Sequence, residues 1–167
     1  MILMKTFLTT LLLLITLDVV NVGCTQKSEE PPYGLITSCQ KGNGAACSLV
    51  GNQYLEGDGV KQDRSKALEF FRQACDGQFA LGCLELGATH ANGKGLMQDY
   101  FKAAESYRQA CDMNFGARGC LALGLAYELG EGVRQSNGDA LIFYGKACDL
   151  ELQEGCENYA RLKTGKR

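Results

Sequence analysis

The chain of 167 residues contains one His, two Pro and no Trp. With a single imidazole, a His-rich metal site or a Ser-His-Asp triad is difficult to build. The chain has 17 Lys and Arg against 19 Asp and Glu, which gives a formal net charge of −2. The cations are scattered among the acids and form no basic stripe, so we expect no nucleic-acid partner.

Long apolar runs are also missing, apart from one near the N-terminus. The run from Phe7 to Leu17 follows a Lys, ends in polar residues and is too short to cross roughly 30 Å of hydrocarbon. These features are typical of a signal peptide, so we interpret residues 1–23 as one. The stretch "NVGC" ends at Cys24 and resembles a bacterial lipobox, although Asn21 stands where Leu is usual.

Two outcomes therefore remain open at Cys24, which are lipidation or ordinary cleavage and release. Either one predicts export from a bacterial cell, to the periplasm, to the outer membrane or as a secreted protein. Residues 24–34 are polar and contain both prolines. Because this segment cannot bury an apolar face, we interpret it as a tether before a folded part at 35–167.

The nine cysteines follow a regular pattern. Cys39, Cys75, Cys111 and Cys148 recur about every 36 residues, and a second cysteine follows each of them after eight or nine positions. Cys24 falls outside these pairs, as expected for a lipidated cysteine, which is not available to form a disulfide. In an exported chain, paired cysteines predict disulfides. The closely spaced C-x2-C pairs of zinc sites are missing, so we expect no metal.

The residues between the cysteines repeat as well. Each unit has a Gly-x-Gly turn, at Gly57, Gly93 and Gly130, and then an N-cap type of residue before a stretch with helical periodicity, such as "KALEFFRQAC". Period-two alternation is absent, so we predict helices and no strands. His90 occupies the slot that holds Tyr54 and Tyr127 in the other units, and we interpret it as a packed ring.

The pattern "LG…Y…G.GV..D..KA…Y..AC" resembles the Sel1-like repeat, a relative of tetratricopeptide repeats. The paired cysteines are similar to those of its cysteine-rich subgroup, the Helicobacter cysteine-rich proteins. The resemblance covers about Leu35 to Lys163, although Ser136 and Asp139 stand where Asp and Lys are usual. It implies an all-α solenoid of stacked αα-hairpins, with about three full repeats and caps.

In this arrangement the peptide within each cysteine pair joins two antiparallel helices. Eight cysteines allow 105 connectivities in principle. The symmetry of the repeats favours the set in which each disulfide staples one unit to the next: Cys39–Cys47, Cys75–Cys83, Cys111–Cys120 and Cys148–Cys156.

The commonest use of such a solenoid is binding through a concave surface that is lined mainly by the first helices. Positions that recur between units are framework, whereas positions that differ can contact a ligand or simply tolerate solvent. We expect a monomer without a cofactor that binds a peptide, protein or peptidoglycan-like ligand, with an apolar anchor at the last two of these positions: Leu49, Asn52, Gln53, Glu85, Thr89, Leu125 and Leu129.

An enzyme is the alternative, because some cysteine-rich members are described as β-lactamases or penicillin binders. Serine enzymes of that chemistry use Ser-x-x-Lys, a Ser-x-Asn type of motif and Lys-Thr-Gly on a strand. The chain contains "SCQK" from Ser38 to Lys41, "SNG" from Ser136 and "KTG" from Lys163. Ser38 and Lys41 are the catalytic candidates, but we expect no strand here and we expect the two ends of a solenoid to lie far apart.

Overall fold

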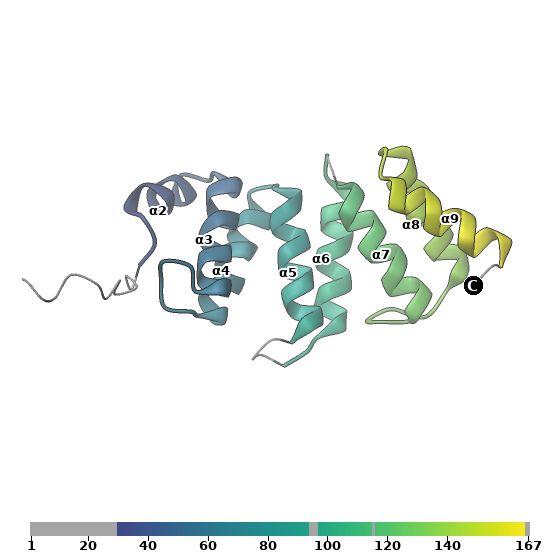
Figure 1. The fold of residues 1–167 in the computed structure, drawn as a ribbon, viewed down its shortest axis with the longest axis horizontal. Helices are drawn as coiled ribbons and strands as arrows, with labels where there is room; N and C mark the ends of the chain where they lie inside the picture. Colours follow the sequence, from purple (N-terminus) through teal and green to yellow (C-terminus); the bar gives the residue numbers. More distant parts are fainter. Residues whose placement is uncertain (1–29, 94–96, 115, 166–167) are drawn as a thin grey trace, which may run out of the picture.

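The structure, a computed structural model, describes residues 30–93, 97–114 and 116–165, and this part of the chain is helical without strands. The helices stand side by side in a row, with the first and the last at opposite ends (Figure 1). In chain order they are α2 (Tyr33–Gln40), α3 (Gly44–Glu56), α4 (Arg64–Asp76), α5 (Ala80–Asn92), α6 (Tyr100–Asp112), α7 (Ala117–Leu129), α8 (Asn137–Asp149) and α9 (Gln153–Thr164).

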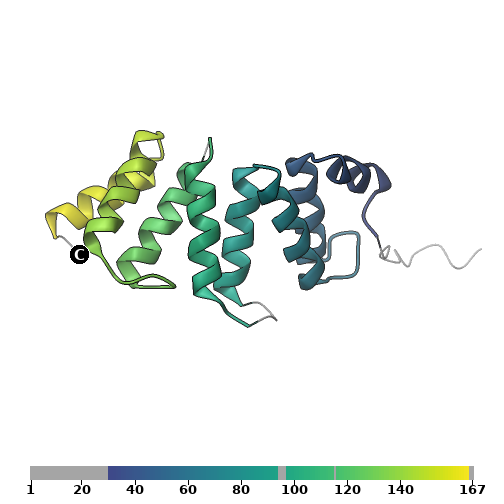
Figure 2. The ribbon, with the colours of Figure 1, turned by 180° about the vertical axis from the view of Figure 1, so that it is seen from behind.

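The helices form three pairs, α3 with α4, α5 with α6 and α7 with α8, while α2 and α9 flank them. Figure 2 shows the same row from behind. The first helices α3, α5 and α7 contact one another more closely than the second helices α4, α6 and α8 do. Because the row is tighter on one side, it curves, and the first helices line its concave face. The predicted all-α solenoid is confirmed.

Each second helix begins at the N-cap that the sequence predicts. The side chains of Asp63 and Asp99 accept hydrogen bonds of 3.0 Å from the backbone amides three residues later. Ser136, which departs from the pattern, does the same for Asp139 at 3.2 Å. A Ser hydroxyl satisfies a free helix amide about as well as an Asp carboxylate does, so the third repeat keeps its helix.

The Gly-x-Gly turns end the first helices. Gly57, Gly93 and Gly130 adopt left-handed backbone angles, with φ of 71°, 55° and 76°. A glutamine five residues later then donates its side-chain amide to a carbonyl of the last helical turn. These hydrogen bonds measure 2.6 to 2.8 Å, and they join Gln62 to Leu55, Gln98 to Ala91 and Gln135 to Glu128.

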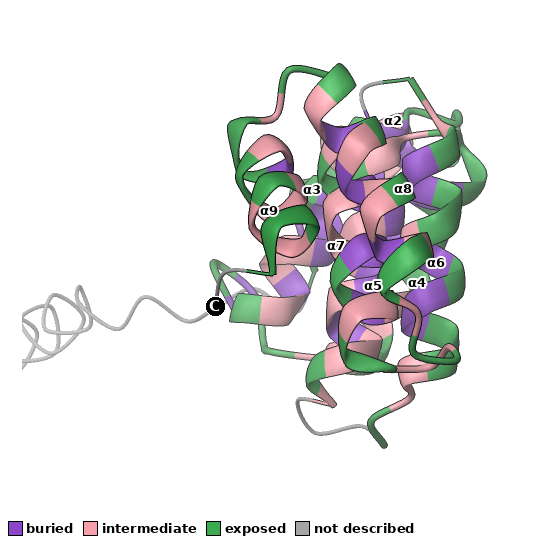
Figure 3. Ribbon diagram, turned by 90° about the vertical axis from the view of Figure 1, so that its right-hand side faces the viewer, coloured by how far each residue is buried: buried purple, intermediate pink, exposed green. Residues whose placement is uncertain are grey.

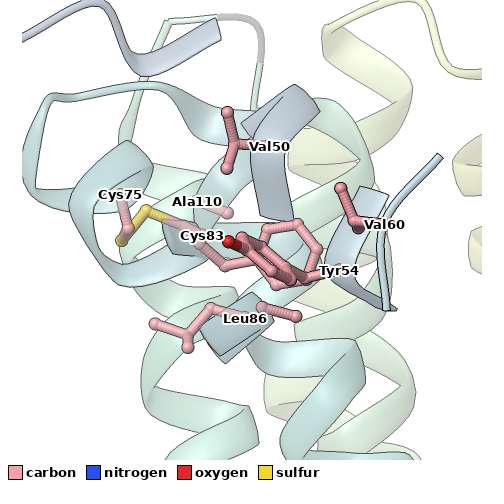
Figure 4. Packing of buried hydrophobic residues seen from close by; sticks show 9 residues of the cluster. Val50, Tyr54, Val60, Cys75, Cys83, Leu86 and Ala110 are labelled. Carbon is pink, nitrogen blue, oxygen red and sulfur yellow. A yellow bond between two sulfur atoms is a disulfide. The ribbon is translucent and has the colours of Figure 1, made fainter. Parts of the chain in front are cut away.

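The core lies between the helices of the row, as Figure 3 shows for one end. Rings from the second helices press against glycines of the first helices: a Cβ at Gly51 would lie 2.6 Å from the Phe71 ring, and one at Gly124 would lie 2.7 Å from the Tyr144 ring. Figure 4 shows the buried cluster around Val50, Tyr54 and Leu86. Small residues therefore bring the paired helices close together.

Four disulfides cross-link the row, and they are the four pairs that the repeat symmetry predicts. Each joins the end of one helix to the start of the next, with Cα atoms 4.4 to 4.6 Å apart. The bond between Cys75 and Cys83 is visible in Figure 4. Disulfides persist in oxidising compartments, so these bonds indicate an extracytoplasmic protein.

The predicted tether differs from the structure at its end. Helix α2 begins at Tyr33, two residues before the expected start of the folded part. Pro31 is buried, and the Glu30 carboxylate accepts a 2.9 Å hydrogen bond from Tyr54 and a 3.3 Å bond from Lys66. Glu30 and Pro31 thus contact the folded part, whereas residues 32–34 are exposed. The predicted signal peptide and Cys24 lie outside the described residues, within which no helix is long and apolar enough to span a bilayer.

Candidate functional site

The predicted binding positions on the first helices divide into open and packed ones. Leu49 on α3 is 54% exposed, and Leu125 and Leu129 on α7 are 47% and 55% exposed. Asn52 is half-buried. The three leucines therefore place apolar side chains in contact with solvent.

Thr89 and Gln53 are the packed positions. Thr89 is buried, and its hydroxyl donates a 2.8 Å hydrogen bond to the carbonyl of Glu85 on the same helix. Ala126, at the same position of the third repeat, is buried too. Gln53 is half-buried, and its side-chain oxygen is enclosed by protein. The expectation that Thr89 faces a ligand is therefore corrected, because this position of the repeat points into the array.

A small pocket of about 80 Å³ lies where α7 packs on the α5–α6 pair. Tyr107 of α6 lines it together with Ala122 and Leu125 of α7. Burial, reinforced by the negative charges of Glu131 and Glu85, raises the pKa of Tyr107 to about 12. The phenol is therefore protonated at neutral pH and can donate a hydrogen bond to a ligand.

A larger pocket of about 330 Å³ lies along the edge of the row where the disulfide-bridged loops join successive helices. It is lined by the first turns of α5 and α7 and by the loop between α8 and α9, so residues of the second and third repeats build it together. The lining is mostly apolar, with Leu81, Leu84, Leu150 and Leu152. The sequence comparison missed this pocket because its residues belong to the cysteine loops, which look like connectors when each unit is taken alone.

Glu85 links the two pockets electrostatically. Burial raises the pKa of its carboxyl group, and the positive charge of Arg118, which lines the larger pocket, opposes that effect. The negative charge of the same carboxylate helps to raise the pKa of Tyr107, which lines the smaller pocket. No described side chain donates a hydrogen bond to Glu85, so its oxygens can accept from a ligand. We call the two pockets together with Glu85, Leu125 and Leu129 the concave groove.

The enzyme candidates do not come together. Ser38 lies in α2 and Lys41 caps that helix, whereas Lys163 lies in α9 at the opposite end of the row (Figure 1). The Ser136 hydroxyl is used as the N-cap of α8. Because the described part of the chain has no strand, Lys163 does not lie on one, and the arrangement of a serine β-lactamase is not assembled.

His90 lies in the last turn of α5, in the place that Tyr54 takes in α3, and its side chain is half-buried. Burial lowers the pKa of the imidazole, and so do the charges of Lys102 and Arg72, while Asp99 raises it. Within residues 30–93, 97–114 and 116–165, His, Cys, Asp and Glu side chains form no group of three or more that could hold a metal ion.

The protein is a helical repeat scaffold: its helices are paired through glycine turns, the pairs stack in a row, and α2 and α9 flank them. The Sel1 repeat model matches residues 44–79, 80–115 and 117–152, which is more than half of the chain. The protein therefore belongs to the Sel1 repeat family, whose repeats generally mediate protein–protein interaction. A search of curated proteins finds no match.

Solved structures show the same architecture. A Sel1 repeat protein from Oxalobacter formigenes is 26% identical, with a TM-score of 0.67 over 76% of this chain and 95% of that one. Helicobacter pylori cysteine rich protein B is 30% identical, with a TM-score of 0.58 over 74% and 93%. A protective antigen of uropathogenic Escherichia coli, 24% identical with a TM-score of 0.66 over 73% and 26%, shares the fold.

Proposed function

We propose that this protein binds an extended peptide in the concave groove. The observation that carries the proposal is the exposure of leucines on the first helices beside two pockets. Leu125 and Leu129 are about half exposed, and Leu81 and Leu150 are 38% and 47% exposed at the larger pocket. Exposed apolar side chains that gather at a pocket are typical of an interaction surface.

The polar groups of the groove define the peptide further. Glu85 is a partly buried carboxylate that can accept hydrogen bonds, so a Lys or Arg of the peptide would relieve its desolvation. Tyr107 can donate to a backbone carbonyl. The peptide therefore has an apolar residue for each pocket and a basic residue between them. Peptidoglycan stem peptides share part of this chemistry and form a second set of probes.

The test is a selection of peptides from a random library on the oxidised protein, with soluble muropeptides measured in parallel. Selected peptides should lose at least tenfold in affinity for Leu125→Glu, because a charge replaces the apolar anchor. Ile142→Glu is the matched control: Ile142 is 58% exposed and lies on the second helix α8. Equal binding to both variants, or no enrichment of any peptide or muropeptide, would contradict the proposal.

The place of action is also a proposal, namely export with a lipid anchor at Cys24, which would hold the monomeric array at a membrane surface. Two observations support it: the stretch before Cys24 resembles a lipobox, and Cys24 lies outside the four cysteine pairs. Metabolic labelling with radioactive palmitate should mark the protein and fail to mark Cys24→Ser. Equal labelling of the two would show that the anchor is elsewhere, and a released, unlabelled protein would favour simple secretion.

A further inference from the structure

An aromatic pair that two repeats contain is missing from the middle repeat. Tyr54 stacks on Phe70 with centroids 5.7 Å apart, and Tyr127 stacks on Phe143 at 5.3 Å. The planes of the rings differ by only 11° and 8°. At the same two positions the middle repeat has His90 and Ser106. One ring is therefore smaller there, and the other is absent.

The missing volume is left as a pocket. A cavity of about 290 Å³ lies among α4, α5 and α6, with Leu86, His90 and Ser106 in its lining. The Ser106 hydroxyl already has a hydrogen-bond partner, because it donates a 2.8 Å bond to the carbonyl of Lys102. None of its lining residues belongs to the two pockets of the concave groove, so it is a separate site.

Two cations border this pocket, and their counterparts in other repeats both contact a tyrosine hydroxyl. Arg108 donates a 2.8 Å hydrogen bond to Tyr127, and Lys66 lies 3.5 Å from the Tyr54 oxygen. The equivalent residues at the pocket are Arg72 and Lys102. Lys102 pairs with Asp99 at 3.1 Å, whereas Arg72 has no hydrogen bond or ion pair within the described part of the chain.

The charges around the pocket limit what it can hold. Asp76 and Glu105 border it together with Arg72 and Lys102, so a strongly charged anion such as a phosphate would meet two carboxylates. Burial and the neighbouring cations lower the pKa of His90, so the imidazole is neutral at pH 7 and offers a flat ring. The pocket is thus matched to an uncharged ring that carries a hydrogen-bond acceptor.

We propose that this pocket binds the side chain of a tyrosine from a partner protein, with the phenol ring stacked on His90 and its oxygen accepting a hydrogen bond from Arg72. The ring replaces the aromatic partner that Phe70 and Phe143 supply in the other repeats. The phenol oxygen accepts a hydrogen bond from Arg72, as the Tyr127 oxygen accepts one from Arg108. The protein therefore has a second contact for partners on its other side, which is independent of the concave groove.

The test is an NMR titration of the oxidised protein with N-acetyl-tyrosinamide, N-acetyl-phenylalaninamide and N-acetyl-leucinamide. The tyrosine amide should shift the signals of His90, Ser106 and Leu86 with a Kd on the order of 1 mM, as expected for a ligand of this size. The phenylalanine amide should bind about tenfold more weakly, because it leaves Arg72 without an acceptor. The leucine amide should not stack.

Two variants make the result specific. His90→Tyr with Ser106→Phe restores the pair of the other repeats, so it should keep its helicity and lose the shifts. Arg72→Met, whose side chain has no hydrogen-bond donor, should bring the tyrosine and phenylalanine amides to equal affinity. Shifts that persist in the filled double variant, equal binding of the two aromatic amides to the unaltered protein, or no saturable shift at the pocket would each overturn the proposal.

Discussion

At the scale of single residues, glycines set how closely the helices of a repeat approach. Gly124 faces the fully buried ring of Tyr144, which has no room to move away from a new methyl group. Gly124→Ala should therefore lower the free energy of unfolding by about 1–3 kcal/mol. Gly138→Ala is the control, because only a side-chain oxygen at 3.9 Å lies near and helix propensity should raise stability. Urea denaturation that shifts in the same direction for both would contradict this account.

A carboxylate near the C-terminal end adds stability that depends on pH. Glu128 accepts hydrogen bonds from both terminal nitrogens of Arg161, at 2.8 and 2.6 Å, and one of 2.7 Å from Tyr144. The bonds from Arg161 hold the pKa of Glu128 below its ordinary value of 4.5. A lowered pKa means that the stabilisation is present above that value and is lost as the pH falls through the folded-state pKa.

Glu128→Gln should therefore cost stability at pH 7, by about 1 kcal/mol since Arg161 is partly exposed. The difference between variant and unaltered protein should shrink as the pH falls below 4.5, the ordinary pKa of Glu. Urea midpoints at several pH values measure it. A difference that stays constant across the pH range would show that Glu128 acts through packing and not through its charge.

At the scale of elements, three of the four loops inside the disulfide pairs contain a left-handed residue. Gly42, Gln78 and Glu151 occupy the same loop position and have φ of 87°, 58° and 63°. Residues other than glycine are strained there. Gln78→Gly and Glu151→Gly should each raise the free energy of unfolding by up to about 1 kcal/mol.

Gly42→Ala is the converse test of the loop position. A Cβ at Gly42 would meet no atom within 4 Å, so any loss of stability comes from the backbone conformation alone. Thermal unfolding should show a lower midpoint for Gly42→Ala and higher midpoints for the two glycine variants. A neutral Gly42→Ala would show that the loop relaxes at no cost.

At the scale of the whole molecule, a row of helices has no central core to hold its ends together, and each pair packs only on its neighbours. The four disulfides close short loops, worth about 2.5 kcal/mol each in the chain-entropy model. Their sum is comparable to the whole stability of an ordinary domain. Full reduction, checked by mass spectrometry, should therefore abolish most of the helical circular dichroism signal. Unchanged helicity and an unchanged urea midpoint would refute this role.

The sequence alone determined the framework. The period of the repeat, the N-caps at Asp63, Asp99 and Ser136, the turn glycines and the four cysteine pairs all depend on contacts between residues close in the chain, and repetition makes such contacts visible. The same comparison of units singled out Leu125 and Leu129, which are about half exposed, whereas their role in binding remains a proposal.

Only the tertiary structure decided which surfaces are hollow. The burial of Thr89, the apolar pocket at Leu150 and the cavity beside His90 each depend on how one repeat packs on the next. Spacing along one unit does not give the angle and distance between units, since those are set by the sum of many side-chain contacts. The local pattern thus determines what each repeat is, and the packing of neighbouring repeats determines where this protein has room for a partner.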